Sequence, residues 1–172
     1  LKEINSLVEL FFKKFEQVTS DNFEKMKNTF LVSLKQKNKG DKFFSYSWGA
    51  TNTRVRVLTN YLINIISKGD RCVLLSENRP EWLISDIAIM NAGGVTVPLF
   101  TTYSENDYKY IINDCEPKVC IISNIQQFKK IKNFIKDETV LISIDKFDQN
   151  IICFDEIFDK VLFDYSKEID QT

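Results

Sequence analysis

The residues best placed to meet a ligand follow the first buried strand that the sequence predicts, residues 71–76. The run from Asn78 to Trp82 (Asn-Arg-Pro-Glu-Trp) comes after the carboxyl end of this strand, where α/β proteins usually bind ligands. Its asparagine, proline and glutamate are also typical of a helix start, and its tryptophan of helix packing. Helix initiation therefore explains most of the run, and Arg79 is its least explained residue.

Other side chains offer little independent chemistry. The chain has no histidine, which removes the commonest general base, the commonest zinc ligand and any Ser-His or Cys-His nucleophile pair. Its four cysteines show no CxxC spacing, and two lie in apolar runs. We predict buried free thiols in a reducing compartment rather than a metal or redox site at Cys72, Cys115, Cys120 and Cys153.

A triphosphate site is also missing. An enzyme that activates a carboxylate with ATP usually holds the phosphates with a glycine-rich loop. The chain has five glycines, and none lies in a GxGxxG or GxxxxGK arrangement. The sequence therefore contains neither a dinucleotide fingerprint nor a P-loop.

The elements that position these residues alternate between strand and helix. A strand over residues 71–76 is followed by a helix that Asn78 caps and that ends at Gly93-Gly94, and then by a strand at Val95–Leu99. Because this connection carries a helix, the two strands should be parallel and the crossover right-handed. Apolar residues on several sides of the helix predict extensive burial: Trp82, Leu83, Ile84, Ile87, Ala88 and Met90.

The same alternation continues toward the C-terminus. Ser104 and Asp107 have the spacing of a capping box, and Glu116-Pro117 ends the helix that they begin. The next elements are a strand, an amphipathic helix, a strand, a region with one short helix and a strand-like end, and a polar tail: Val119–Ile122, Ile125–Ile135, Thr139–Ile144, residues 154–163 and residues 164–172. The pattern predicts an α/β layered fold with a mostly parallel sheet flanked by helices.

The N-terminal part predicts a different arrangement. Apolar residues from Ile4 to Phe15 recur at helical spacing, and their stripe must pack on the core, a partner subunit or a membrane surface. Alternating residues at 30–35 and 43–46, joined by a turn at 38–41, predict a small β-hairpin. A helix from about Trp48 to Ser67 follows, capped by Ser47 and ended by Gly69.

Four pieces of sequence together resemble the N-terminal part of adenylate-forming acyl-CoA synthetases. They are Gly69-Asp70-Arg71, the run from Ser76 to Trp82, Ala92-Gly93-Gly94 and Val97-Pro98-Leu99. Their order and spacing are specific, and their amino-acid sequence is most similar to that of long-chain fatty-acid CoA ligases. The resemblance runs from about Trp48 to Asn124 and implies that residues 1–163 are the N-terminal subdomain of the ligase domain, with 164–172 leading toward its phosphate loop.

The resemblance also implies an activity for the complete enzyme. It would use ATP and Mg²⁺ to convert a fatty acid to an acyl-adenylate and would then pass the acyl group to CoA. The family's phosphate loop, ribose-binding aspartate and catalytic lysine would lie beyond Thr172. We therefore expect no catalytic or metal-binding residues here, no tight cofactor binding, and no turnover by this chain alone.

Of the family's binding sites, the resemblance implies that this chain contains only one wall of the CoA site. In related acetyl-CoA synthetases, an aromatic residue and two glycines pass close to CoA, and arginines after the next strand meet its 3′-phosphate. The matching positions here are Phe100, Thr101 and Thr102, with Lys129 and Lys130 as the nearest basic residues. Thr lacks the freedom of Gly, and Lys lacks the fork of Arg, so the alternative is an ordinary loop beside a solvated helix face.

The composition of the chain limits the classes of partner that we expect it to bind. Lys plus Arg number 23 and Asp plus Glu 24, which gives no field to attract nucleic acid. No stretch approaches the about 20 apolar residues of a membrane span, and the N-terminus does not read as a signal peptide. We expect one domain in the cytoplasm, with peripheral membrane contact through the Ile4–Phe15 stripe as an alternative and self-association through exposed apolar surface.

Two other hypotheses stay open at this stage. The enzyme could activate acetate, an aryl acid, or an amino acid loaded on a carrier protein, because acyl-pocket residues are expected further along the chain. Alternatively, the chain is a non-catalytic interaction module that keeps the same fold.

Overall fold

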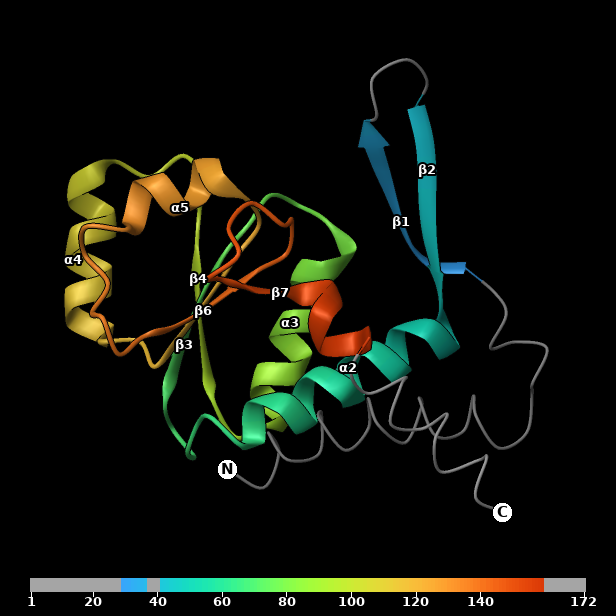
Figure 1. Cartoon of the computed structure of the whole chain (residues 1–172), viewed down its shortest axis with the longest axis horizontal. Helices are drawn as coiled ribbons and strands as arrows, with labels where there is room; N and C mark the ends of the chain where they lie inside the picture. The colour runs from blue at the N-terminus through green and yellow to red at the C-terminus, as the bar shows by residue number, and fades with distance from the viewer. Residues whose placement is uncertain (1–28, 37–40, 160–172) are drawn as a thin grey trace, which may run out of the picture. The chain divides into compact units, whose positions relative to one another are not determined.

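A computed structural model describes the backbone of residues 29–36 and 41–159 and the side chains of residues 46–159. The chain divides into two compact units, Leu1–Arg54 and Val55–Thr172, which we describe separately (Figure 1). The helix predicted at Ile4–Phe15 and the polar tail at 164–172 lie outside the described residues.

The first unit contains the predicted hairpin. Strands β1 (Thr29–Gln36) and β2 (Asp41–Ser47) pair antiparallel, with most of the predicted turn outside the described residues. Helix α2 (Trp48–Ile63) follows directly, and Ser47 Oγ accepts a hydrogen bond from the amide of Ala50 at 3.1 Å. This contact confirms Ser47 as the cap.

The second unit is built on a five-stranded parallel sheet. Its strands are β3 (Arg71–Leu75), β4 (Val95–Leu99), β5 (Val119–Ile122), β6 (Val140–Ser143) and β7 (Ile152–Cys153), in the order β4-β3-β5-β6-β7. The four longer strands confirm the prediction within one or two residues. The two-residue strand β7 was not predicted, and a short helical segment at 154–159 follows it.

Helices cover both faces of this sheet. Helix α3 (Pro80–Asn91) lies on one face with the part of α2 that belongs to this unit, from Val55 onward, and α4 (Glu105–Cys115) and α5 (Ile125–Ile131) lie on the other (Figure 1). All residues of β5 and all but the first of β3 are buried. This double coverage explains why both strands read as continuous apolar runs rather than alternating ones.

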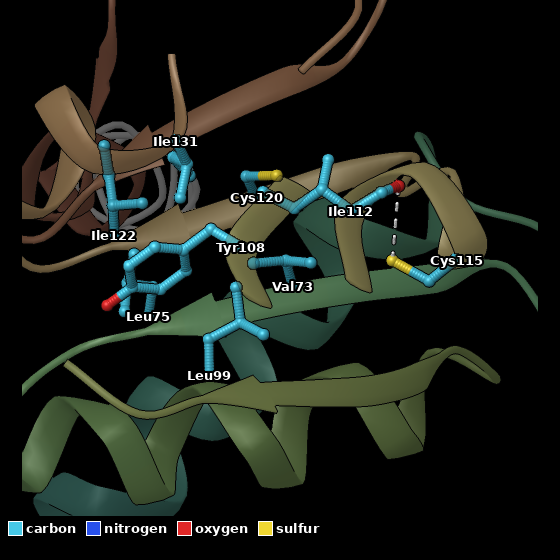
Figure 2. Close-up of a cluster of buried hydrophobic side chains, with 9 residues drawn as sticks. All are labelled: Val73, Leu75, Leu99, Tyr108, Ile112, Cys115, Cys120, Ile122 and Ile131. Atoms are coloured by element: carbon cyan, nitrogen blue, oxygen red, sulfur yellow. Dashed lines mark hydrogen bonds between the residues drawn. The ribbon is translucent and has the colours of Figure 1, made fainter. Parts of the chain in front are cut away.

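The face under α4 and α5 holds a continuous hydrophobic cluster (Figure 2). Alternate residues of β3 and β5 point into it, Tyr108 and Ile112 come from α4, and Ile131 comes from α5. Tyr108 is 2 % exposed, and its hydroxyl donates to the carbonyl of Phe100 at 2.8 Å. Tyr108 is therefore a core aromatic whose polar end is satisfied.

Four local predictions were wrong. Helix α2 ends at Ile63 rather than at about Ser67. Arg79, not Asn78, occupies the cap position of α3, because Pro80 takes the first helical position and the residue before it must be extended. Met90 is 45 % exposed, and its neighbour Ile89 is fully buried instead. Helix α5 ends at Ile131 rather than near Ile135, since the following residues form turns.

Candidate functional site at the carboxyl end of the sheet

The sheet order makes a topological switch point between β3 and β5. Strand β4 lies on one side of β3 and β5 on the other, and the helices that follow β3 and β5 lie on opposite faces. The loops after these two strands diverge at such a point, which is where doubly wound α/β folds usually bind ligands. Here the loops are residues 76–79 and 123–124.

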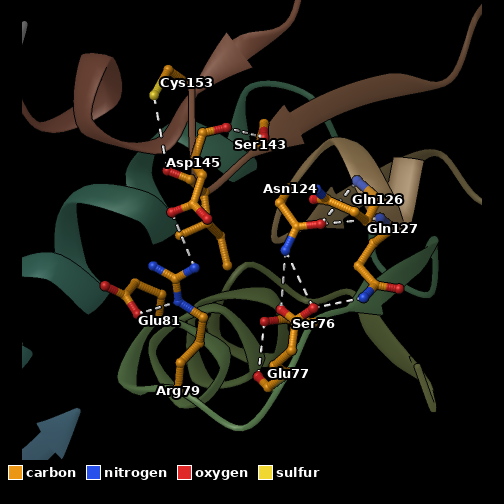
Figure 3. Close-up of polar contacts among 11 residues, drawn as sticks. Ser76, Glu77, Arg79, Glu81, Asn124, Gln126, Gln127, Ser143, Asp145 and Cys153 are labelled. Atoms are coloured by element: carbon orange, nitrogen blue, oxygen red, sulfur yellow. Dashed lines mark hydrogen bonds and ion pairs between the residues drawn. The ribbon is translucent and has the colours of Figure 1, made fainter. Parts of the chain in front are cut away.

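A carboxylate of the chain itself occupies this position. Glu77 accepts a hydrogen bond from Gln127 Nε2 at 2.6 Å, and Asn124 Nδ2 lies 3.2 and 3.4 Å from its two oxygens (Figure 3). Burial by itself would raise the pKa of Glu77, but hydrogen bonds, among them those from Gln127 and Asn124, lower it overall. Glu77 is thus held as an anion at the N-terminus of α5.

Arg79 ties the same loop to another part of the sheet. Its Nε lies 2.8 Å from Glu81 Oε2, and its Nη1 lies 3.1 Å from Asp145 Oδ1 in the loop after β6. Burial would lower the pKa of Arg79, but these two carboxylates raise it overall. The residue that the sequence left least explained therefore has a structural role, bridging α3 to a loop 66 residues further along the chain.

A pocket of about 400 Å³ opens beside this network, between the loops after β3 and β4. Its walls combine polar groups with apolar surface, which suits an organic ligand with a few polar atoms. The lining residues are Ser76, Glu77, Asn78, Trp82, Pro98, Leu99, Phe100 and Thr101.

Two of the five residues that the resemblance placed beside CoA, Phe100 and Thr101, line one rim of the pocket, and a third, Lys130, contacts Thr101. Phe100 is 68 % exposed, and its ring meets that of Tyr103 edge-on at 5.3 Å between centroids. Lys130 Nζ donates to the carbonyl of Thr101 at 2.6 Å. A lysine of α5 thus lies against the loop that follows β4, 29 residues earlier in the chain.

The other two predicted residues are less engaged. Thr102 and Lys129 are both exposed, and neither lines the pocket. Asn78 and Trp82, from the run that the sequence placed where a ligand could bind, both line the pocket. Sequence reasoning missed Glu77 as a pocket residue, although it too follows the carboxyl end of a buried strand.

The cysteines offer no reactive group here. All four are buried and unpaired, as predicted. Burial raises the pKa of Cys72 to about 12, with a smaller contribution from Asp70, and burial also raises the pKa values of Cys115 and Cys120. Among the described residues, no group of three or more histidine, cysteine, aspartate or glutamate side chains could hold a metal ion.

Within the described part of the chain, no helix is long and apolar enough to span a lipid bilayer.

Comparison with known proteins matches residues 22–161 to the family model described as AMP-binding enzyme. Fatty acyl-CoA synthetase A of Dictyostelium discoideum is 36 % identical over 93 residues, 49 % of this chain and 14 % of that protein. Long-chain-fatty-acid–CoA ligase ACSBG1 of Rattus norvegicus is 26 % identical over 121 residues, 70 % of this chain and 16 % of that protein. The chain thus spans about a sixth of the length of these relatives.

A solved structure agrees at the level of the fold. The anthranilate CoA ligase AuaEII, in complex with anthranoyl-AMP, aligns with 85 % of this chain and 27 % of its own length. The TM-score is 0.67 and the sequence identity 15 %. The predicted α/β architecture therefore recurs in a solved ligase structure.

Proposed function

We propose, given that this chain belongs to the AMP-binding enzyme family, that the whole protein is an ATP-dependent acyl-CoA ligase. In this reaction a carboxylate attacks the α-phosphorus of ATP and releases pyrophosphate, and the CoA thiol then displaces AMP from the acyl carbon. A fatty acid of long chain is the proposed acid, supported by the names of the Dictyostelium and Rattus relatives. An aryl acid is the alternative that the anthranilate ligase structure supports.

We further propose that this chain supplies part of the CoA side of the site. The observation that carries this is that Phe100 and Thr101 line one rim of the pocket and that Lys130 donates to the carbonyl of Thr101. The exposed ring of Phe100 suits contact with a planar base. The ammonium of Lys130 has three N–H donors, so it can meet a phosphate oxygen while it keeps its bond to Thr101. Thr102 and Lys129 remain proposed as outer contacts.

The described residues fit some of the expected groups better than others. A base and a phosphate of CoA fit the ring and the ammonium at this rim. For ATP and Mg²⁺ we name no residues, because the chain contains no glycine-rich phosphate loop and its described part no cluster of metal ligands. When bound, ATP would supply the leaving group that activates the carboxylate. We retain the proposed division into a subdomain at 1–163 and a tail at 164–172.

The activity is tested by acid-dependent pyrophosphate release from the full-length protein with palmitate, acetate, anthranilate and a panel of amino acids. We expect the highest kcat/KM with palmitate. A preference for another acid would replace the proposed substrate and keep the reaction. Folded protein that releases no pyrophosphate with any acid would contradict the proposal.

The CoA side is tested by Lys130→Met and Phe100→Ala. Each should raise the KM for CoA about tenfold, the effect expected from losing one charge-assisted or stacking contact, and should change the KM for ATP much less. Lys132→Met is the matched control, because Lys132 is exposed at the end of the same helix. Equal effects of Lys130→Met and Lys132→Met on the KM for CoA would count against a CoA contact at Lys130.

A further inference from the structure

Glu77 joins two separate parts of the second unit. It lies in the loop after β3, and its partners come from the end of β5 and from α5, 47 to 50 residues further along the chain. An exposed loop glutamate does not usually collect several donors from another element. The number and origin of these contacts indicate a specific role for its carboxylate.

Both polar atoms of the Asn124 side-chain amide form hydrogen bonds. Its Oδ1 accepts from the amides of Gln126 and Gln127 at 3.0 and 3.1 Å and so caps α5, while its Nδ2 faces Glu77. The carboxylate therefore holds the residue that begins the helix. Any movement of Glu77 is passed directly to the N-terminus of α5.

Gln127 adds a second connection at a cost. Its side chain is 5 % exposed, and its Oε1 has no hydrogen-bond partner among the described residues. A buried amide with one unpaired atom is less favourable than an apolar side chain of the same volume. What the amide provides at this position is the 2.6 Å bond from its Nε2 to Glu77.

Helix α5 carries this connection to the pocket rim. Lys130 is three residues after Gln127 and so lies on the same side of the helix. Its ammonium meets the carbonyl of Thr101, in a loop where the carbonyl of Phe100 already accepts from the Tyr103 amide at 3.3 Å and from the Tyr108 hydroxyl at 2.8 Å. Lys130 is thus the contact by which α5 reaches this loop.

From this geometry we propose that Glu77 is a positioning residue for the pocket rim. By fixing the N-terminus of α5, its carboxylate sets where Lys130 meets the loop from Phe100 to Thr102. Glu77 lines one side of the pocket itself, so one carboxylate sets the spacing between the two loops that form the walls. The role does not require Glu77 to touch any reacting atom.

Amide hydrogen exchange on the full chain without ligand tests this directly. Gln127→Met keeps the side-chain volume and removes the donor to Glu77, and Glu77→Ala removes the carboxylate. Each should lower protection of the Tyr103 amide about fivefold, as expected for a loop that loses one hydrogen-bonded support, together with protection at the start of α5. Glu77→Gln, which keeps one acceptor oxygen, should restore most of the protection.

Two control variants distinguish a positioning role of Glu77 from a purely local contact. Lys130→Met should lower protection at Tyr103 and leave the start of α5 unchanged, because it cuts the connection beyond the helix. Glu138→Gln removes an exposed carboxylate at the other end of the sheet and should change neither site. If Gln127→Met and Glu77→Ala loosen α5 but leave Tyr103 as protected as before, the proposal is wrong.

A kinetic experiment also tests this inference, and it rests on the proposed function. In the full-length enzyme, Gln127→Met should raise the KM for CoA about fivefold with kcat nearly unchanged. Absence of CoA-dependent activity in the unaltered protein would contradict the proposed function and leave the exchange experiment to decide this inference. An active enzyme whose KM for CoA is insensitive to Gln127→Met would overturn the positioning role.

Discussion

The two ends of the parallel sheet are held together in different ways. At the amino end, backbone groups of the loops meet directly: the Gly69 amide donates to the Gly93 carbonyl at 2.8 Å, and the Val95 amide donates to the Asp70 carbonyl at 2.8 Å. Side chains there also bond to backbone carbonyls, as Arg71 Nε does to that of Cys115 at 2.7 Å. At the carboxyl end, side chains such as Glu77, Arg79 and Lys130 make the long-range contacts between loops.

This difference bears on which end of the sheet determines the stability of the fold and which end can vary in shape. Backbone joints depend on close approach and tolerate little change in side-chain size. Side-chain joints can be altered one residue at a time while the strands stay in register, which is the arrangement expected where ligands are bound on a rigid scaffold. Substitutions at the amino end should therefore act mainly on folding, and those at the carboxyl end on the shape of the pocket.

The largest effect is expected from Gly94→Val at the amino end. A Cβ at this position would lie 2.8 Å from Ile66 Cδ1 and 3.0 Å from Ile89 Cγ2. Crowding of this kind should lower the free energy of unfolding by about 3 kcal/mol, measured by urea denaturation. The control is Gly69→Ala, where φ is +89° but nothing lies within 4 Å, so the cost should be only the left-handed strain of about 1 kcal/mol. Equal costs for the two would show that crowding is not what Gly94 avoids.

Arg79→Met gives the corresponding test at the carboxyl end. The substitution keeps an apolar stem but leaves Glu81 and Asp145 without their shared partner. We expect a loss of about 2 kcal/mol in the free energy of unfolding, less than for a fully buried pair because Asp145 is partly exposed. Arg79→Lys should recover only part of this loss, since lysine cannot meet two carboxylates in the same fork. Full recovery with lysine would mean that charge alone matters.

A smaller effect at the amino end is expected from Thr139→Val. The Thr139 hydroxyl is buried and donates to the carbonyl of Pro117 at 3.2 Å. Removing one buried hydrogen bond with little change of shape should lower the free energy of unfolding by about 1 kcal/mol. Thr139→Ser keeps the hydroxyl and is the comparison. A serine variant as destabilised as the valine variant would assign the loss to packing instead.

The smallest effect is a pH dependence at the carboxyl end. The folded pKa of Glu77 is lowered, so its contribution to stability is present above the unfolded pKa of about 4.3 and is lost as the pH falls through the folded value. The difference in unfolding free energy between the unaltered chain and Glu77→Gln should therefore shrink in acid. Glu138→Gln measures the general effect of losing one negative charge. A difference that stays constant from pH 7 to pH 3 would contradict this assignment.

The sequence predicted the elements well where the signals are local. Buried strands read as continuous apolar runs, and Ser104 with Asp107 forms the capping box that the spacing predicted. The cap of α3 was placed one residue too early, although Pro80 at the first helical position identified Arg79 as the cap. Strand β7 has two residues, too few to leave a periodic pattern.

The site was less accessible from the sequence. The resemblance pointed to Phe100, Thr101 and Lys130, but only the fold brings Lys130 to the Thr101 carbonyl. Asn124 and Gln127, the partners of Glu77, and Asp145, one partner of Arg79, lie 47 to 66 residues away, and no local pattern reports a contact over that separation. Polar residues whose role is to join loops are therefore the part that sequence reasoning misses.

The four buried thiols can be used to detect local unfolding of this chain. Cys72 and Cys120 are fully buried in the two central strands, while Cys115 at the end of α4 and Cys153 in β7 retain 9 % and 5 % of their exposure. Since only a thiolate that reaches solvent is alkylated, each cysteine records how often its segment opens. Mass spectrometry after a pulse of iodoacetamide would then rank the segments by local unfolding without any introduced label.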